Sequence, residues 1–365
     1  MTTERLTRAI GVISGTSMDG IDVSMVDTDG ALNVKSGPGR TYPYPEALRA
    51  KLLQVIGEPT QVLTDPLTDL DREVTEAHIA AIREFLAELA IEPGSVQLIG
   101  LHGQTVYHRP QDRFTRLLGI GPLVAAALEI DTVNRFRHAD VASGGEGAPF
   151  APLYHRALAH GLEAPLMVLN LGGVGNVTYI DGETVIAFDT GPASALLDDF
   201  VLRRRGVPYD ENGALAASGA ADRRLVAAFM DNPFFDRPAP KSLDRQDFHA
   251  RARGVEALSD QDGAATLAEF TVLSVVASLR HVPRRPLRWL VTGGGRRNGH
   301  FMRRLREELA VPVDPVEAVG WDGDFLEAQC FGYLAVRSTR GLPLSLPTTT
   351  GVPRPMPGGE LHRAA

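Results

Sequence analysis

Three short segments place glycines and small polar side chains beside strand-like runs of Val, Ile and Leu. They are GTSMDG (15–20), LNLGGVGNV (169–177) and LVTGGGRRN (290–298). Glycine lets the backbone approach an anion closely, and consecutive N–H groups in a tight turn form an anion-binding concavity. Thr16 and Ser17 can donate to phosphate oxygens, and Asp19 can hold Mg²⁺ through water. One such turn fits an ordinary strand connection equally well, but three together indicate a grip on nucleotide phosphates.

The class of nucleotide site is narrowed by what the sequence lacks. It contains no GxxxxGK(S/T) segment, and its only lysines are Lys35, Lys51 and Lys241, so a P-loop nucleoside triphosphatase is excluded. The absence of an HRD loop and of a DFG segment excludes a protein kinase. None of the glycine turns has GxGxxG with Rossmann spacing, so a dinucleotide site is disfavoured.

Two carboxylates lie where acid–base chemistry would need them. Asp189, in AFDTGPAS, ends a strand just before a Gly-Pro turn and a helix, so it can project into a cleft as a general base. The simpler alternative is that Asp189 only caps the turn. Glu327 lies early in a mostly apolar helix, where its carboxylate needs a partner, a cleft or solvent.

Two further segments carry groups that suit a sugar. LHGQTVYH contains His102, Gln104 and Thr105, which pair well with hydroxyls, although a self-satisfied polar loop would have the same composition. RFRHADVASGGEGAPF contains Asp140 and also Arg137, whose guanidinium can pair with a carboxylate bidentately. The position of this second segment between two expected lobes suits a hinge that carries substrate ligands.

The elements around these segments repeat along the chain. Strands 9–15 and 21–30, joined by GTSMDG, form an expected hairpin, and residues 165–189 repeat the pattern of strand, glycine turn and strand. Further expected elements are a strand at 96–106, a strand, glycine turn and helix over 288–309, and helices at 45–56, 65–90 with Asp65 as N-cap, 148–160, 194–205, 262–281 as an amphipathic helix, and 324–339. The tail from Pro343 is expected to be a loop. The simplest account is a duplicated α/β core.

Composition limits the remaining possibilities. With 365 residues, 44% hydrophobic and 22% charged, the chain is an ordinary globular protein of about two domains. A net charge of −8 opposes nucleic-acid binding. No apolar stretch seems, on reading, to reach the roughly 20 residues that span a bilayer, and no secretory signal is recognised, so we expect a cytoplasmic protein without membrane partners. Cys330 stands alone in an apolar-periodic segment and is expected in the core.

The sequence resembles the anhydro-N-acetylmuramic acid kinases of the sugar kinase–Hsp70–actin superfamily. The matching segments occur in family order and span nearly the whole chain: IGVISGTSMDGID, LHGQTVYH, RFRHADVASGGEGAPF, NLGGVGNVTYI, FDTGPASALLDD, PKSLDRQDF, TGGGRRN and EAQCFGYLA. The resemblance implies an α/β, two-lobed actin/hexokinase-like ATPase fold of duplicated ribonuclease-H-like domains with a central nucleotide cleft. The expected lobes are 1–138 with 340–365, and 139–339. A homodimer is kept as a hypothesis.

The resemblance also implies an activity and a set of site residues. Family members use ATP and Mg²⁺ to open the 1,6-anhydro ring with water and phosphorylate O6, giving N-acetylmuramate 6-phosphate and ADP for peptidoglycan recycling. Asp189 matches the general base and Glu327 the acidic residue that helps to place the water. The nucleotide residues implied are Gly15, Thr16, Ser17, Met18, Asp19, Gly20, Gly172, Gly173, Asn176, Gly293, Gly294, Gly295 and Asn298, with Asp19 toward the metal. The sugar residues implied are His102, Gln104, Thr105, Arg137 and Asp140.

This sequence departs from the family pattern near the expected sugar pocket. The departures are Leu101, Arg135, Glu146, Ala193 and Ser194. They remove no catalytic group, but they leave the substituents of the sugar open. One alternative is therefore a kinase of another 1,6-anhydrosugar such as levoglucosan. A second alternative, from a different class, is an actin/Hsp70-like ATP-binding module whose nucleotide cycle drives partner binding.

Overall fold

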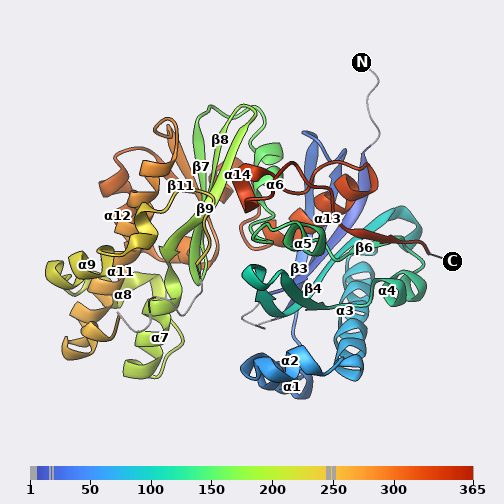
Figure 1. Ribbon diagram of the computed structural model, residues 1–365, viewed down its shortest axis with the longest axis horizontal. Helices are drawn as coiled ribbons and strands as arrows, with labels where there is room; N and C mark the ends of the chain where they lie inside the picture. The colour runs from blue at the N-terminus through green and yellow to red at the C-terminus, as the bar shows by residue number, and fades with distance from the viewer. Residues whose placement is uncertain (1–5, 16–17, 19, 244–247, 249–251, 365) are drawn as a thin grey trace. The chain divides into compact units, whose positions relative to one another are not determined.

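The protein is described here by a computed structural model covering residues 6–15, 18, 20–243, 248 and 252–364 (Figure 1). The chain forms two compact units, residues 1–160 with 325–365 and residues 161–324, which we call the first and second units. These limits differ from the expected ones at 138 and 339. The reason is that helix α13 (Leu326–Thr339) packs on strands of the first unit, so the last helix of the chain belongs to the first unit.

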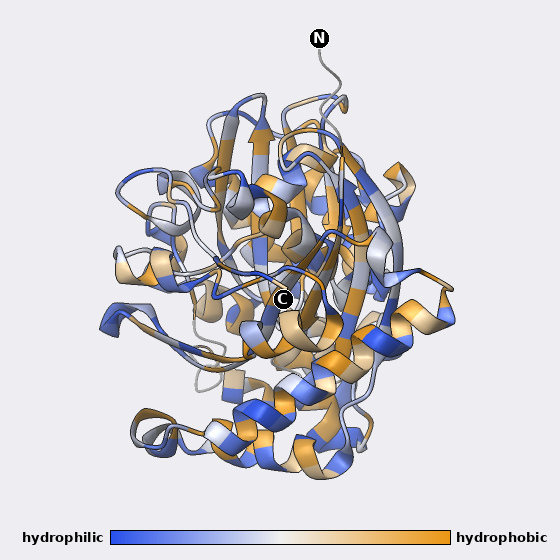
Figure 2. Ribbon diagram, turned by 90° about the vertical axis from the view of Figure 1, so that its right-hand side faces the viewer, coloured by the Kyte–Doolittle hydropathy of each residue, from blue (hydrophilic) through white to orange (hydrophobic). Residues whose placement is uncertain are grey.

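The first unit contains a mixed sheet. In its described part the order is β12-β6-β4-β1-β2-β3, with β5 paired to β4. The strands are β1 (Thr7–Ser14), β2 (Ile21–Thr28), β3 (Val34–Tyr42), β4 (Leu98–Arg109), β5 (Phe114–Leu118), β6 (Thr132–Asn134) and β12 (Glu360–His362). Besides α13, its helices are α1 (Glu46–Gly57), α2 (Pro59–Thr64), α3 (Thr68–Glu88), α4 (Gly121–Leu128), α5 (His138–Ala142), α6 (Pro152–Leu158) and α14 (Pro347–Thr350). Figure 2 shows these strands as largely hydrophobic and the outer helices as mixed.

The second unit contains a sheet in the order β11-β10-β7-β8-β9. The strands are β7 (Leu166–Leu171), β8 (Val174–Asp181), β9 (Thr184–Pro192), β10 (Arg288–Thr292) and β11 (Val313–Pro315). The helices in its described part are α7 (Ser194–Arg205), α8 (Ala214–Ala217), α9 (Arg223–Met230), α11 (Asp260–Ala277) and α12 (Gly299–Leu309).

The two sheets have the same topology. In each unit an antiparallel meander of three strands, β1-β2-β3 or β7-β8-β9, is followed by two strands parallel to its first strand, β4 and β6 or β10 and β11. The order β6-β4-β1-β2-β3 therefore repeats as β11-β10-β7-β8-β9. The predicted duplicated α/β core is confirmed, and both predicted hairpins are present.

Helix α13 lies unusually close to the first sheet. A Cβ atom added at Gly11 of β1 would lie 1.7 Å from the carbonyl oxygen of Ala328, and one added at Gly100 of β4 would lie 2.0 Å from that of Phe331. Only residues without a side chain allow this approach. Cys330 lies on the same helix with 2% of its surface exposed, which confirms the core interpretation.

Helix α11 is the central helix of the second unit, not the amphipathic helix expected from the sequence. Buried residues occur around most of its circumference, and it packs against α7, α8, α9, α12 and β9. Residues 260–281 are long and apolar enough to cross a membrane by length and composition, which corrects the expectation that no stretch would be. Because 72% of that window is buried within the protein, its hydrophobicity is accounted for by packing.

Two local expectations were wrong. Asp65 is not the N-cap of one long helix, because Leu67 adopts a left-handed conformation and separates α2 from α3, and the Asp65 carboxylate accepts a 2.7 Å bond from the Leu67 N–H instead. The tail is not a loop throughout, because β12 pairs antiparallel with β6.

We expect Gly11→Ala to destabilise the first unit by about 3 kcal/mol or more, because the methyl group would meet helix backbone that cannot rotate away. The matched control is Gly57→Ala at the end of α1, where an added Cβ meets nothing within 4 Å and helix propensity improves. Urea unfolding followed by circular dichroism measures both. Equal stability of the two variants would contradict the close-packing interpretation.

Candidate active site

A row of polar side chains crosses the sheet of the second unit. Thr292, Asn170, Asn176 and Asp189 occupy directly paired positions on β10, β7, β8 and β9. Paired residues on neighbouring strands project from the same face, so these four share one face of the sheet. Their neighbours along the strands, such as Leu171, alternate to the opposite face and enter the hydrophobic core.

The sequence analysis had selected Asn176 and Asp189 but not Asn170 and Thr292. A signal was present for Asn170, because it interrupts the otherwise apolar strand LMVLNL directly before a glycine turn. Thr292 ends β10 in the equivalent place. Only the strand register shows that the four residues are adjacent.

Asp189 is held by the segment that follows η4 (Pro233–Asp236). Its backbone N–H donates to the carbonyl oxygen of Lys241 at 2.9 Å, and its Oδ2 accepts a 2.9 Å bond from the Leu243 N–H. Residues 241–243 therefore extend along β9 and fix both the backbone and the carboxylate of Asp189. The partly buried carboxylate is oriented by protein donors, as a general base would have to be.

The glycine turns of the second unit divide into two kinds. Gly293 and Gly295 are required by packing, because added Cβ atoms would lie 2.3 Å from Asn170 Oδ1 and 2.6 Å from Leu171 Cβ. Added Cβ atoms at Gly172 and Gly173 would meet nothing closer than 3.5 Å, and Gly294 has open space within 4 Å. This second kind leaves room for an anion to approach the backbone, which fits a phosphate.

Helix termini hold the remaining parts of these turns. The Gly172 carbonyl oxygen accepts bonds from the N–H and hydroxyl of Ser194 at 2.9 and 3.0 Å, at the start of α7. Asn298 caps α12 through a 3.1 Å bond from the Phe301 N–H to its Oδ1. The Asn298 side-chain oxygen is thus engaged by the helix.

The first glycine turn is only partly described. Met18 has a positive φ of 53°, donates to the Gly15 carbonyl oxygen at 3.1 Å, and accepts a 3.1 Å bond from Arg49 Nε. An added Cβ at Gly20 would lie 2.7 Å from Thr41 Cγ2, so this position needs glycine. Thr16, Ser17 and Asp19 lie outside the described residues. Their assignment to phosphate and Mg²⁺ stays a prediction.

In the first unit, Arg137 and His102 form a hydrogen-bonded pair. Arg137 Nε donates to His102 Nε2 at 2.9 Å, and Arg137 Nη1 donates to the Gly147 carbonyl oxygen at 2.5 Å. The guanidinium also lies 5.7 Å from the ring centroid of Phe150. Arg137 Nη2 carries the donors that these two bonds do not use.

The protonation state of His102 follows from this geometry. Since Arg137 supplies a proton to Nε2, the imidazole must be neutral and must carry its own proton on Nδ1, which lies 2.8 Å from the Gly103 carbonyl oxygen. Burial, and secondarily the charge of Arg137, lowers the pKa of His102 well below its usual value. His102 is therefore a fixed acceptor that orients Arg137.

Asp140 organises the loop that follows α5. Its carboxylate accepts bonds from the Gly147 N–H at 2.7 Å, from Ser345 Oγ at 2.5 Å and from Thr350 Oγ1 at 2.6 Å, and only 2% of the residue is exposed. A sugar hydroxyl would have to displace one of these donors. Since Gly147 also accepts the bond from Arg137, Asp140 connects the tail of the chain to that guanidinium.

Gln104 is fully buried in a second polar network. Its Nε2 donates to the carbonyl oxygens of Gly15 and Thr105 at 3.3 and 3.2 Å. The Tyr44 hydroxyl contacts Gln104 Oε1 at 3.4 Å and Ser14 Oγ at 2.8 Å. Gln104 thus ties the first glycine turn to β4, whereas Thr105 is partly exposed.

Glu327 lies in the first turn of α13, and its side chain is accessible to solvent. Partial desolvation raises the pKa of its carboxyl, while the charge of Arg137 lowers it. The Glu327 carboxylate therefore shares the electrostatic surroundings of Arg137, the expected sugar ligand.

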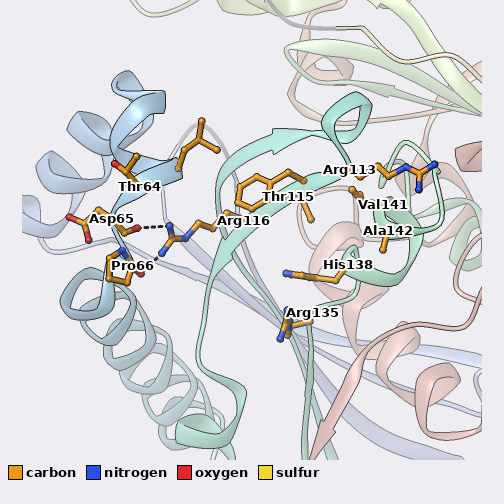
Figure 3. A pocket seen from close by; sticks show the side chains of 12 residues that line it. Thr64, Asp65, Pro66, Arg113, Thr115, Arg116, Arg135, His138, Val141 and Ala142 are labelled. Atoms are coloured by element: carbon orange, nitrogen blue, oxygen red, sulfur yellow. Dashed lines mark hydrogen bonds between the residues drawn. The ribbon is translucent and has the colours of Figure 1, made fainter.

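A separate hollow of about 730 Å³ lies on the first unit, with Arg113, Arg116, Arg135 and His138 among the residues that line it (Figure 3). Arg116 donates to the carbonyl oxygens of Val62, Asp65 and Pro66. Arg113 and Arg116 extend in opposite directions in Figure 3. Because these cations do not converge, the hollow is not an anion site of the kind that the glycine turns suggest.

The repeated meander followed by two parallel strands is the ribonuclease-H-like topology. Its duplication in one chain, with a polar row and glycine turns at the strand ends, places the protein in the actin/hexokinase class of ATPases. The model of the anhydro-N-acetylmuramic acid kinase family matches residues 7–363, and the chain belongs to this family.

Curated relatives carry the same description. The anhydro-N-acetylmuramic acid kinase of Rhodospirillum rubrum is 50% identical over 359 residues, which cover 98% of this chain and 94% of the relative. That of Paramagnetospirillum magneticum is 50% identical over 356 residues, covering 97% and 99%. That of Rhizorhabdus wittichii is 47% identical over 363 residues, covering 97% and 98%.

Buried neutral histidines predict acid lability. Burial lowers the pKa of His78 to about 4, whereas in the unfolded chain it titrates near 6.5. As pH falls from 6.5 to 5 the unfolded state takes up the proton and the folded state does not, so this one residue should cost about 2 kcal/mol of stability. Above 6.5 its effect should level off.

The free energy of unfolding, measured by urea titration at several pH values, checks this expectation. His78→Gln should flatten the dependence between pH 6.5 and 5 by about 2 kcal/mol, because glutamine does not titrate. An unchanged slope in the variant would mean that His78 is not held neutral in the folded protein.

Proposed function

We propose that the protein is an ATP-dependent kinase that opens the 1,6-anhydro ring of anhydro-N-acetylmuramic acid with water and phosphorylates O6, giving N-acetylmuramate 6-phosphate and ADP. Family membership over residues 7–363 supports the activity. The observation that carries the site is the register that sets Asp189 in line with Asn176 and Asn170 on one face of the sheet. The product would enter peptidoglycan recycling, and a cytoplasmic location stays a prediction.

The proposed reaction balances as follows. Water attacks C1 and gives its proton to Asp189, the C1–O6 bond breaks, and O6 takes the γ-phosphoryl group as ADP leaves. Asp189 must accept a proton at a defined position, and the Leu243 N–H holds one carboxylate oxygen while the other is directed elsewhere. Mg²⁺, when bound, neutralises phosphate charge. Asp19 is proposed to hold it.

In the first unit we propose that Arg137 and Thr105 contact the sugar, with Arg137 Nη2 directed at its carboxylate. His102, Gln104 and Asp140 are proposed to act behind them, because each is buried and already bonded to the protein. Glu327 is proposed to help place the attacking water. The solvent access of its side chain is compatible with that role.

Product analysis tests the function. The purified protein is incubated with ATP and either anhydro-N-acetylmuramic acid or levoglucosan, and ADP and sugar phosphate are measured. ADP formation that requires the first sugar and yields a 6-phosphate supports the proposal. Turnover of levoglucosan alone would favour a kinase of another anhydrosugar. ATP turnover independent of any sugar would favour an ATP-binding module.

Asp189→Asn should nearly abolish turnover while both substrates still bind. The amide keeps the shape of the side chain but accepts no proton, and loss of a general base costs about 10²–10⁴ in rate. Steady-state kinetics, ligand binding and melting temperature on the one variant measure this. If Asp189 only caps its turn, the variant would instead lose about 1 kcal/mol of stability and keep much of its kcat.

Asp19→Asn should weaken turnover with Mg²⁺–ATP while sugar binding is largely retained, because the proposal assigns Asp19 to the nucleotide. Calorimetric titration with the sugar and kinetics with varied Mg²⁺–ATP separate the two effects. Parallel loss of sugar affinity would contradict the assignment.

A further inference from the structure

Lys241 is a buried cation that the proposed mechanism does not use. It belongs to the segment PKSLDRQDF and has 4% of its surface exposed. Its Nζ donates to the carbonyl oxygens of Phe234 and Phe235 at 2.8 and 3.3 Å and lies 4.6 Å from the ring centroid of Phe234. Burying an ammonium group is costly unless it is compensated, so a lysine at this position requires a reason.

The backbone of the same residue supports Asp189. The Lys241 carbonyl oxygen accepts the Asp189 N–H at 2.9 Å, and two residues later the Leu243 N–H donates to Asp189 Oδ2 at 2.9 Å. Residue 241 is therefore attached on one side to β9 through its backbone and on the other to η4 through its side chain. No other side-chain hydrogen bond to the described part of segment 241–243 has this geometry of a bridge between η4 and β9.

We propose that Lys241 is a positioning residue for the reaction: its ammonium group fixes segment 241–243 on η4, so that the Leu243 N–H holds the Asp189 carboxylate in the orientation of a general base. The inference rests on the proposed role of Asp189. It adds a residue that touches no substrate but determines how that base is presented.

The surroundings of Lys241 make this attachment sensitive to pH. Arg237, Arg280 and His281 face it as cationic or titratable groups, and Asp236 and Asp189 as carboxylates; His281 Nε2 lies 3.2 Å from its Nζ. Burial, and secondarily the nearby arginines, lowers the pKa of Lys241 to about 8. Since a neutral amine is a weaker donor to carbonyl oxygens, the attachment should loosen as pH rises through 8.

The first test is Lys241→Met, which removes the ammonium group and keeps an unbranched side chain. We expect kcat to fall about 10- to 100-fold with KM for ATP unchanged, and the acidic limb of the kcat profile to move to higher pH, because a carboxylate that loses an N–H donor is protonated more easily. Lys51→Met is the matched control, since Lys51 is exposed and pairs with Glu73 on the surface of the first unit. Its kinetics should be unchanged.

Combining Lys241→Met with Asp189→Asn provides the sharper readout. If Lys241 acts through Asp189, the double variant should be no slower than Asp189→Asn alone, because the base is already absent. Losses that multiply would overturn the inference. So would a Lys241→Met enzyme with a lower melting temperature but normal kcat and pH profile. If Asp189→Asn itself retained kcat, the proposed function would fail instead, so the two failures are distinguishable.

Lys241→Arg covers the case in which the methionine variant does not fold. Arginine keeps the positive charge but does not titrate in the accessible range. The alkaline limb of activity, expected near pH 8 in the unaltered enzyme, should therefore move upward by at least one pH unit in this variant. An alkaline limb at the same pH in both proteins would contradict the proposal.

Discussion

The pairing of β7, β8 and β9 is the constraint on which the second unit depends. Because side chains alternate along a strand, a register shift of one residue would send Asn176 or Asp189 to the core face and bring an apolar neighbour into the polar row. The core residues between them, such as Leu169 and Phe188, oppose such a shift because they would become exposed. Burial on one face thus maintains the chemistry on the other.

The first unit meets a different constraint, the burial of an arginine. Arg137 is compensated by acceptors, the Gly147 carbonyl oxygen and a neutral imidazole, instead of by a close carboxylate pair. Such a pair would neutralise the guanidinium and weaken it toward an anionic substrate. Asp140 contributes indirectly by holding the Gly147 backbone, and residues from the tail complete that attachment.

Both units therefore use the same principle for their functional side chains. Each such group is held by backbone atoms whose own position is fixed by a buried polar residue: Asp140 for Arg137, and Lys241 for Asp189. Backbone donors and acceptors have little freedom to rotate, so they orient a side chain at a small cost in conformational entropy. Glycines act in the same way at α13, where Gly11 and Gly100 allow the helix backbone to lie against the sheet.

The sequence by itself determined the duplicated α/β architecture, because hydrophobic runs and glycine turns are local patterns, and it singled out Asp189, Glu327 and Arg137 as polar residues in revealing places. It could not show that Asn170 and Thr292 join the row of Asp189, that His102 and Gln104 are buried, or that the tail returns to pair with β6. These features depend on strand register and on contacts between residues far apart in the chain. The misplaced N-cap at Asp65 and the amphipathic expectation for α11 have the same origin. A local pattern predicts which element forms, but burial of its faces is decided by what packs against them, and only the tertiary structure contains that information.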